Sequence, residues 1–111
     1  MKRKAVLITF TIRSKKFRNS YERNCFFRSL YGWKQIIKRN EKRYVYRRCG
    51  LLSKIPHLRI DESVFIVLEE HLKQIEEFLK EWEDKVIWHE FEVLLDEARF
   101  KELMKEVEEV V

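Results

Sequence analysis

The stretch Lys4–Ile12 reads KAVLITFTI, and the rest of the 111-residue chain is interpreted around it. Its side chains alternate between two sets, Val6, Ile8, Phe10 and Ile12 in one and Leu7, Thr9 and Thr11 in the other. Alternation with a period of two and many β-branched residues are typical of a β-strand. Since both sets suit a pleated, buried surface, we predict a central strand of a sheet.

Helical and strand periodicity alternate in the segments that follow. We predict helices from residue 21 to about 38, from 70 to 82, and after a cap at Asp96. Their apolar stripes, with spacings of three and four, are Phe26, Leu30, Trp33 and Ile37; Leu72, Ile75, Phe78, Leu79 and Trp82; and Phe100, Leu103, Met104, Val107 and Val110. Strands are predicted at residues 43–52, within 57–68, and at 86–95.

Gly32 leaves an alternative open for the first helix. It costs a helix roughly 1 kcal/mol relative to Ala, so the helix could instead end near Tyr31 and be followed by a strand at residues 33–38. We prefer the continuous helix, because Trp33 and Ile37 continue its stripe.

This order of elements predicts an α+β fold: a ferredoxin-like β-α-β-β-α-β sandwich with an additional C-terminal helix, in a single domain over residues 1–111. Two helices would cover one side of a four-stranded antiparallel sheet. The open side would carry Leu7, Thr9, Tyr44, Tyr46, Arg48, Phe65, Val67 and Trp88. So much apolar surface needs a cover, for which the candidates are the last helix, a second subunit's sheet, or stacked bases.

Positive charge gathers in the first half of the chain. Residues 13–59 hold fifteen Lys or Arg and only two acids, Glu22 and Glu41. Residues 1–60 carry 18 basic and 2 acidic groups, whereas residues 61–111 carry 6 and 17. An ordinary solvated surface mixes the two signs, so the basic half indicates a polyanionic partner.

We therefore predict a non-catalytic protein that binds nucleic acid, most plausibly structured or ribosomal RNA, with DNA as the other option. The basic residues expected to contact phosphate are Lys15, Lys16, Arg18, Arg28, Lys38, Arg39, Lys42, Arg43, Arg47 and Arg48. Tyr44 and Tyr46 lie among them in the string RYVYRR and offer rings on which unpaired bases can stack. Packing beneath the last helix or at a dimer seam is the alternative for these two rings.

Two other classes of protein stay open. One is an interaction module whose basic half meets an acidic protein or the acidic half of another copy. The second is a Mg²⁺-dependent nuclease or integrase-like subunit, using Asp61 and Glu62 with Glu69 or Glu70. The predicted fold resembles the small ferredoxin-like nucleases of CRISPR systems, which carry an Asp at the end of the first strand where this chain has Thr11, Ile12 and Arg13.

No cofactor, metal site or catalytic residue is predicted. His57, His71 and His89 lack ligand spacing, and the only glycines, Gly32 and Gly50, form no phosphate-binding loop. Cys25 and Cys49 are too far apart in sequence for a zinc or redox pair, and we expect two small buried side chains.

A cytoplasmic location is expected, because the longest apolar run is far shorter than the roughly 20 residues of a membrane-spanning helix. The composition, with 39% charged residues, two Gly and one Pro, is typical of proteins from heat-loving organisms. We also predict a homodimer, which could bridge two RNA segments, and a protein partner on the acidic half, residues 61–111, stays open. The dimer interface would be the stripe of the last helix: Phe100, Leu103, Met104 and Val107.

Overall fold

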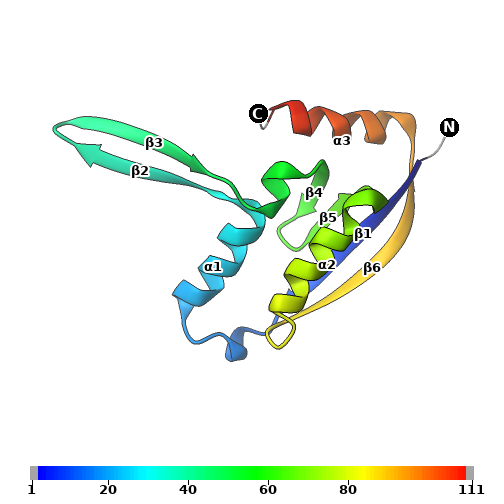
Figure 1. Cartoon of the computed structure of the whole chain (residues 1–111), viewed down its shortest axis with the longest axis horizontal. Coiled ribbons are helices and arrows are strands. Elements are labelled where there is room, and N and C mark those ends of the chain that lie inside the picture. Colours follow the sequence, from blue (N-terminus) through cyan, green and yellow to red (C-terminus); the bar gives the residue numbers. More distant parts are fainter. Residues whose placement is uncertain (1–2, 110–111) are drawn as a thin grey trace.

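A computed structural model of the chain describes residues 3–109, with side chains for residues 3–103. The strands are β1 (Arg3–Ile12), β2 (Trp33–Arg39), β3 (Lys42–Arg48), β4 (His57–Asp61), β5 (Val64–Val67) and β6 (Val86–Leu95). The α-helices are α1 (Ser20–Tyr31), α2 (Leu72–Glu81) and α3 (Glu97–Glu109), and short 3-10 helices lie at η1 (Ser14–Lys16), η2 (Leu51–Lys54) and η3 (Glu69–His71). The α+β class is confirmed (Figure 1).

Four strands form an antiparallel sheet in the order β4-β5-β1-β6. The predicted central strand is confirmed as β1, which pairs along its whole length with β6 and on its other side with β5. The strand predicted within residues 57–68 is two strands, β4 and β5, which pair with each other. Strand β4 takes the place in the sheet that the prediction gave to residues 43–52.

The prediction of one helix from residue 21 to 38 is wrong. Helix α1 ends at Tyr31, and Gly32 caps it with a φ of +83° while its N–H donates to the Arg28 carbonyl. With a ψ of 178° this residue is extended but has a positive φ, a conformation that essentially only glycine adopts, so the helix stops here and the chain continues as a strand. The alternative is confirmed, because strand β2 begins at Trp33.

Strands β2 and β3 pair only with each other, and the ribbon they form extends away from the sheet (Figure 1). We call residues 33–48 the arm and the rest of the described chain the body. Asn40 and Glu41 at its tip have φ values of 49° and 67°, as in the two-residue turns that match the twist of a hairpin. The arm stretches the molecule to 54 × 35 × 20 Å and its radius of gyration to 15.9 Å, against about 13 Å for a compact chain of this size.

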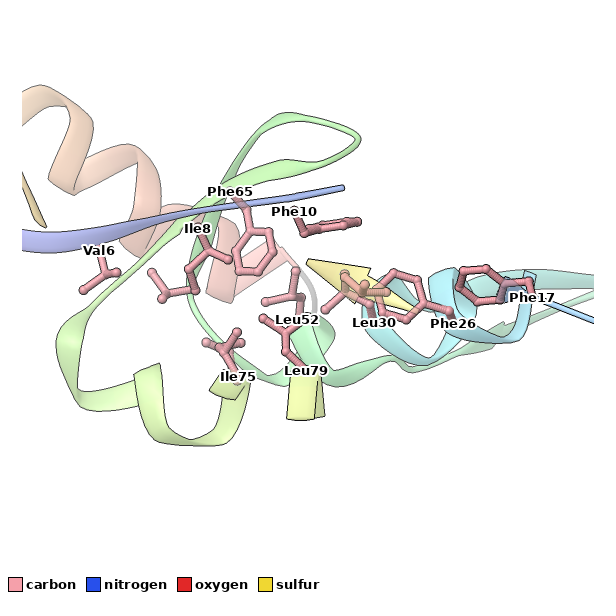
Figure 2. Close-up of a cluster of buried hydrophobic side chains, with 13 residues drawn as sticks. Val6, Ile8, Phe10, Phe17, Phe26, Leu30, Leu52, Phe65, Ile75 and Leu79 are labelled. Atoms are coloured by element: carbon pink, nitrogen blue, oxygen red, sulfur yellow. The ribbon is translucent and has the colours of Figure 1, made fainter. Parts of the chain in front are cut away.

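The main core lies between the sheet and helices α1 and α2 (Figure 2). Phe26 of α1 is fully buried at its centre, with the rings of Phe10, Trp82 and Phe78 within 5.3–5.7 Å of its own. Helix α2 contributes Ile75 and Leu79, as its predicted stripe requires. Aromatic packing of this kind anchors α1, and α1 ends where the arm begins.

The prediction that Phe65 and Val67 lie on the open side of the sheet is wrong. Both residues are buried in the main core. In the antiparallel register Ile8 is opposite Phe65 and Val6 is opposite Val67, and directly opposed residues share a side of the sheet. Trp88, opposite Phe10, also packs against the main core. Tyr44, Tyr46 and Arg48 lie in the arm, outside the sheet altogether.

Helix α3 packs on the other side of the sheet, where a second cluster contains Ala5, Ile66, Leu95 and Leu103. The predicted cap is confirmed, because Asp96 Oδ1 accepts a hydrogen bond from the Arg99 N–H at 2.8 Å. Phe100 is half-buried beneath the Arg3 guanidinium. Met104, Val107 and Val110 lie outside the residues whose side chains are described. Between residues 3 and 109, no helix is long and apolar enough to cross a membrane.

Candidate nucleic-acid interface

The positive charge of the arm is larger than the net charge of the whole chain. Residues 33–48 contain seven Lys or Arg and one acid, Glu41, so the arm contributes +6 to a total of +5. None of the residues found buried between residues 3 and 103 lies in the arm, and β3 is exposed along all seven of its residues. No ion pair among the described residues involves an arm side chain.

The register of the arm places like charges directly opposite each other three times. Lys34 is opposite Arg47, Lys38 is opposite Arg43, and Arg39 is opposite Lys42. Directly opposed like charges destabilise a pair of strands, since their side chains are only about 5 Å apart at the β-carbon. A bound anion would relieve this repulsion, and both phosphate and carboxylate groups form strong, charge-assisted hydrogen bonds with Lys and Arg.

One side of the arm is aromatic and polar. It consists of Trp33, Gln35, Ile37 and Arg39 from β2 with Lys42, Tyr44, Tyr46 and Arg48 from β3. The Arg48 side chain donates to Gln35 Oε1 from Nε at 3.0 Å and from a terminal nitrogen at 2.8 Å, and its guanidinium lies 5.7 Å from the Tyr46 ring. Tyr44 and Tyr46 remain 42% and 46% exposed.

The opposite side of the arm is basic. Lys34, Lys38, Arg43 and Arg47 surround one apolar cross-strand pair, Ile36 and Val45. These two apolar residues are about half exposed. Exposed β-branched residues framed by four cations give a surface with an apolar centre and a positive rim.

The base of the arm is a close backbone contact between the only two glycines of the chain. A Cβ added to Gly50 would lie 2.2 Å from the Gly32 nitrogen, and one added to Gly32 would lie 2.5 Å from the Arg48 carbonyl oxygen. Ser53 Oγ accepts a hydrogen bond from the Gly50 N–H at 3.1 Å. The two strands of the arm thus leave the body through a joint in which no side chain fits between the backbones.

Tyr31 fixes this joint from the body side. Its hydroxyl donates to the Glu62 carbonyl in the turn between β4 and β5, and the Arg59 guanidinium lies 3.9 Å from the centre of its ring. Burial raises the pKa of the Tyr31 hydroxyl to about 12, so it remains a donor at neutral pH. Arg28 of α1 makes a cation–π contact with the first residue of the arm, since its guanidinium lies 4.3 Å from the centre of the Trp33 ring.

A second, smaller basic group lies at the other end of α1. Lys15, Lys16 and Arg18 precede the helix, and a 12-residue helix separates them from the arm by about 18 Å. Arg18 is 3.7 Å from Glu22, which also bonds Lys85. The hydrogen bond from Lys85 holds the pKa of Glu22 below its usual range, so this carboxylate stays charged and partly neutralises the group.

The residues predicted to bind nucleic acid thus fall into two groups. The arm gathers Lys38, Arg39, Lys42, Arg43, Tyr44, Tyr46, Arg47 and Arg48. Lys15, Lys16 and Arg18 lie at the far end of α1, and Arg28 connects the two regions near the base of the arm. Sequence reasoning missed Trp33, Lys34 and Gln35 as surface residues because it placed them in a helix; Gly32 was the signal that could have identified the arm.

One region of the body is acidic and contrasts with the arm. Glu76 of α2 and Glu90 of β6 lie close enough to interact, and burial, followed by the charge of Glu76, raises the pKa of Glu90. Neighbouring acids mark this part of the body as unsuited to phosphate.

The described residues contain no group of three or more His, Cys, Asp or Glu that could hold a metal ion. Asp61 Oδ1 accepts a hydrogen bond from the Glu62 backbone N–H at 2.7 Å, so these adjacent residues are used within their own turn. The cysteines are unpaired, and Cys49 is exposed rather than buried as expected. Comparisons of the chain with protein families, with curated proteins and with solved structures give no match.

Proposed function

We propose that this protein binds nucleic acid through the arm, without catalysing a reaction, and that structured RNA is its target. The observation that carries the proposal is the triple opposition of like charges in the arm. An arm that served only to stabilise the fold would gain from alternating signs across its strands, whereas this one is destabilised in the absence of an anion. The basic group at Lys15, Lys16 and Arg18 would extend the contact along α1.

The shape of the arm supports the same function. A two-stranded ribbon fits the major groove of B-form DNA, and in RNA the wide, shallow groove open to it is the minor one. In either case the ribbon presents both of its sides to a ligand. Isolated hairpins are marginally stable in water, so a ribbon with no core of its own and with its apolar residues half exposed fits a surface that is completed by a partner.

For the body, we propose a ferredoxin-like sandwich with the arm inserted after α1. When the arm is left out, the strands in chain order are β1, β4, β5 and β6, with α1 after the first and α2 after the third. The first strand lies between the third and the fourth. This agrees with the split β-α-β arrangement, and α3 is then an addition on the opposite side of the sheet.

Reversing the charge at the tip of the arm tests the proposed function. Replacing Lys38, Arg39, Lys42 and Arg43 with Glu should abolish binding to a structured RNA and should flatten the dependence of affinity on salt, because each lost phosphate contact removes about one unit of the logarithmic slope. Opposed residues remain like-charged in this variant, so the arm keeps its internal repulsion.

The matched control replaces four exposed lysines of the body, Lys4, Lys73, Lys80 and Lys101, with Glu. It changes the net charge by the same amount and should retain most of the affinity. Equal loss in both variants would mean that overall charge, not the arm, attracts RNA. Full binding by the arm variant would contradict the proposal.

The second candidate is an interaction module in which the arm binds an acidic protein or the acidic half, residues 61–111, of another copy. The charge contrast between arm and body favours it. The same arm variant separates the two, because loss of self-association without loss of RNA affinity would favour the protein partner.

A homodimer remains part of the proposal. Leu103, one of the predicted interface residues, is fully buried against its own sheet, so pairing through it would require α3 to leave the body. Ile87 and Phe91 of β6 offer an exposed apolar surface on the same side of the sheet, at 38% and 55% exposure. Light scattering should report twice the chain mass, and Phe91→Glu should halve it; a monomer at every salt concentration would exclude bridging.

A further inference from the structure

The two sides of the arm match two different forms of nucleic acid. Alternation along β2 and β3 separates Tyr44, Tyr46 and Trp33 on one side from Lys34, Lys38, Arg43 and Arg47 on the other. A single-stranded ligand needs rings for its bases, and a duplex hides its bases and offers phosphate. Only one side of the ribbon carries aromatic rings, together with the cations Arg39, Lys42 and Arg48; the other side carries four cations and no ring.

On the aromatic side, Tyr44 and Tyr46 form a slot for one base. Residues two apart on a strand are separated by about 6.6–7 Å, which is twice the roughly 3.4 Å spacing of stacked bases. One base therefore fits between the two rings. The Arg48 guanidinium, held by Gln35, covers the far side of the Tyr46 ring, so this ring is already supported.

On the basic side, the cations are arranged in two rows across the ribbon. The Lys34 and Arg47 row and the Lys38 and Arg43 row are four residues apart on each strand, or about 13 Å. That separation is close to the roughly 12 Å width of a duplex groove. Phosphates on the two edges of a groove can each meet one row, while Ile36 and Val45 lie over the groove between them.

We propose that the arm binds nucleic acid in which a base-paired stem adjoins unpaired nucleotides. The stem lies against the basic side, and an unpaired base enters the slot between Tyr44 and Tyr46. The two sides of the ribbon are separated only by its own backbone, and a few nucleotides at about 3.4 Å each join the stem to the base around its edge. This inference rests on the proposed function and adds the class of ligand.

The test measures affinities for three oligonucleotides: a fully paired stem, an unstructured strand, and the same stem joined to the same strand. Each is prepared as RNA and as DNA, because a B-form major groove and an A-form minor groove can both accept the ribbon. The joined ligand should bind at least about tenfold more tightly than either part, since attachment of one part raises the effective concentration of the other.

Two variants address the two sides. Tyr44→Thr with Tyr46→Thr keeps strand-forming residues but removes the rings, and should weaken binding of the strand at least about tenfold while sparing the stem. Replacing Lys34, Lys38, Arg43 and Arg47 with Gln should weaken binding of the stem and lower its salt slope by about three to four. Tyr44→Phe with Tyr46→Phe retains both rings and should bind the strand as the unchanged protein does, which controls for folding of the arm.

The outcomes separate this inference from the function on which it rests. If no oligonucleotide binds, the proposed function itself fails. If nucleic acid binds but the joined ligand gains nothing over its parts, or if each variant weakens stem and strand equally, the two-sided arm is wrong and the protein still binds nucleic acid. A gain seen only with RNA, or only with DNA, identifies which of the two is the ligand.

Discussion

The arm and the body differ in their buried residues and in their net charge. Every buried hydrophobic residue described between residues 3 and 103 belongs to the body, and none belongs to the arm. The arm holds a net charge of +6, whereas the remaining 95 residues carry 17 basic and 18 acidic groups and are almost neutral. The body thus accounts for stability, and the arm accounts for the charge.

Because of this difference, the stability of the fold does not explain why the chain has the arm. Burial of apolar surface stabilises the body, and cross-strand contacts alone hold the arm together. Changes in the body should therefore alter the free energy of unfolding, and changes in the arm should alter affinity. The predictions below test that separation, in order of decreasing effect on stability.

The largest effect is expected in the core. Phe26→Ala should lower the free energy of unfolding by about 3–5 kcal/mol, because the ring is fully buried and packs against those of Phe10, Phe78 and Trp82. Urea denaturation measures the loss. RNA affinity per folded molecule should not change; a proportionate loss of affinity would show that arm and body are not separable.

The base of the arm should give an intermediate effect. Gly50→Ala forces a Cβ against the Gly32 nitrogen and should cost about 1–3 kcal/mol in unfolding free energy. The joint also aims the arm, so we expect affinity for RNA to fall as well. Ser53→Ala, which removes only the hydroxyl contact with Gly50, is the milder control. A fully stable Gly50→Ala protein would contradict the close backbone contact.

Within the arm, stability and binding should move in opposite directions. Lys38→Glu creates an opposite-charge pair with Arg43 and should stabilise the protein by about 0.2–1 kcal/mol. The same change should weaken RNA binding, because a cation of the basic side is lost. Thermal unfolding and a binding titration on one sample measure both. If both fall together, repulsion across the arm is not significant.

The smallest effect concerns pH and the body alone. Because the pKa of Glu90 is raised, the folded state binds the proton of this carboxyl more tightly than the unfolded chain does. The stability that Glu90 contributes is therefore present at low pH and is lost as the pH rises above about 4.5. Glu90→Gln should stabilise the protein at pH 7 by no more than about 0.5 kcal/mol, and the gain should vanish at pH 3. Urea midpoints at the two pH values measure this, and a gain that persists in acid would assign the effect to packing.

Periodicity in the sequence was sufficient to predict much of the body. The strand around Ile8, the strand from Val86 to Leu95, the stripe of α2 and the cap at Asp96 all appear as expected. The two strands and the helix have apolar patterns whose period matches only one type of element. The cap is recognised from the residue type that begins a helix. These elements also include most of the core.

The arm could not be placed in the same way, because Trp33 and Ile37 fit a helical stripe as well as a strand. The positive φ of Gly32 decided between them, and conformation at one glycine is not visible in a pattern of apolar residues. The basic residues of the candidate site were identified from composition. Their opposition across the strands depends on register, which only the structure provides.

The separation of charge between arm and body has a kinetic consequence. A molecule with a positive projection and a nearly neutral body is oriented by the field of a polyanion before contact, so most productive encounters should begin at the tip between Asn40 and Glu41. Capture would then be fast and salt-sensitive, while the residence time would depend on the rings behind the tip. The arm, exposed and without a core, would set how quickly the protein finds its ligand as well as how long it stays there.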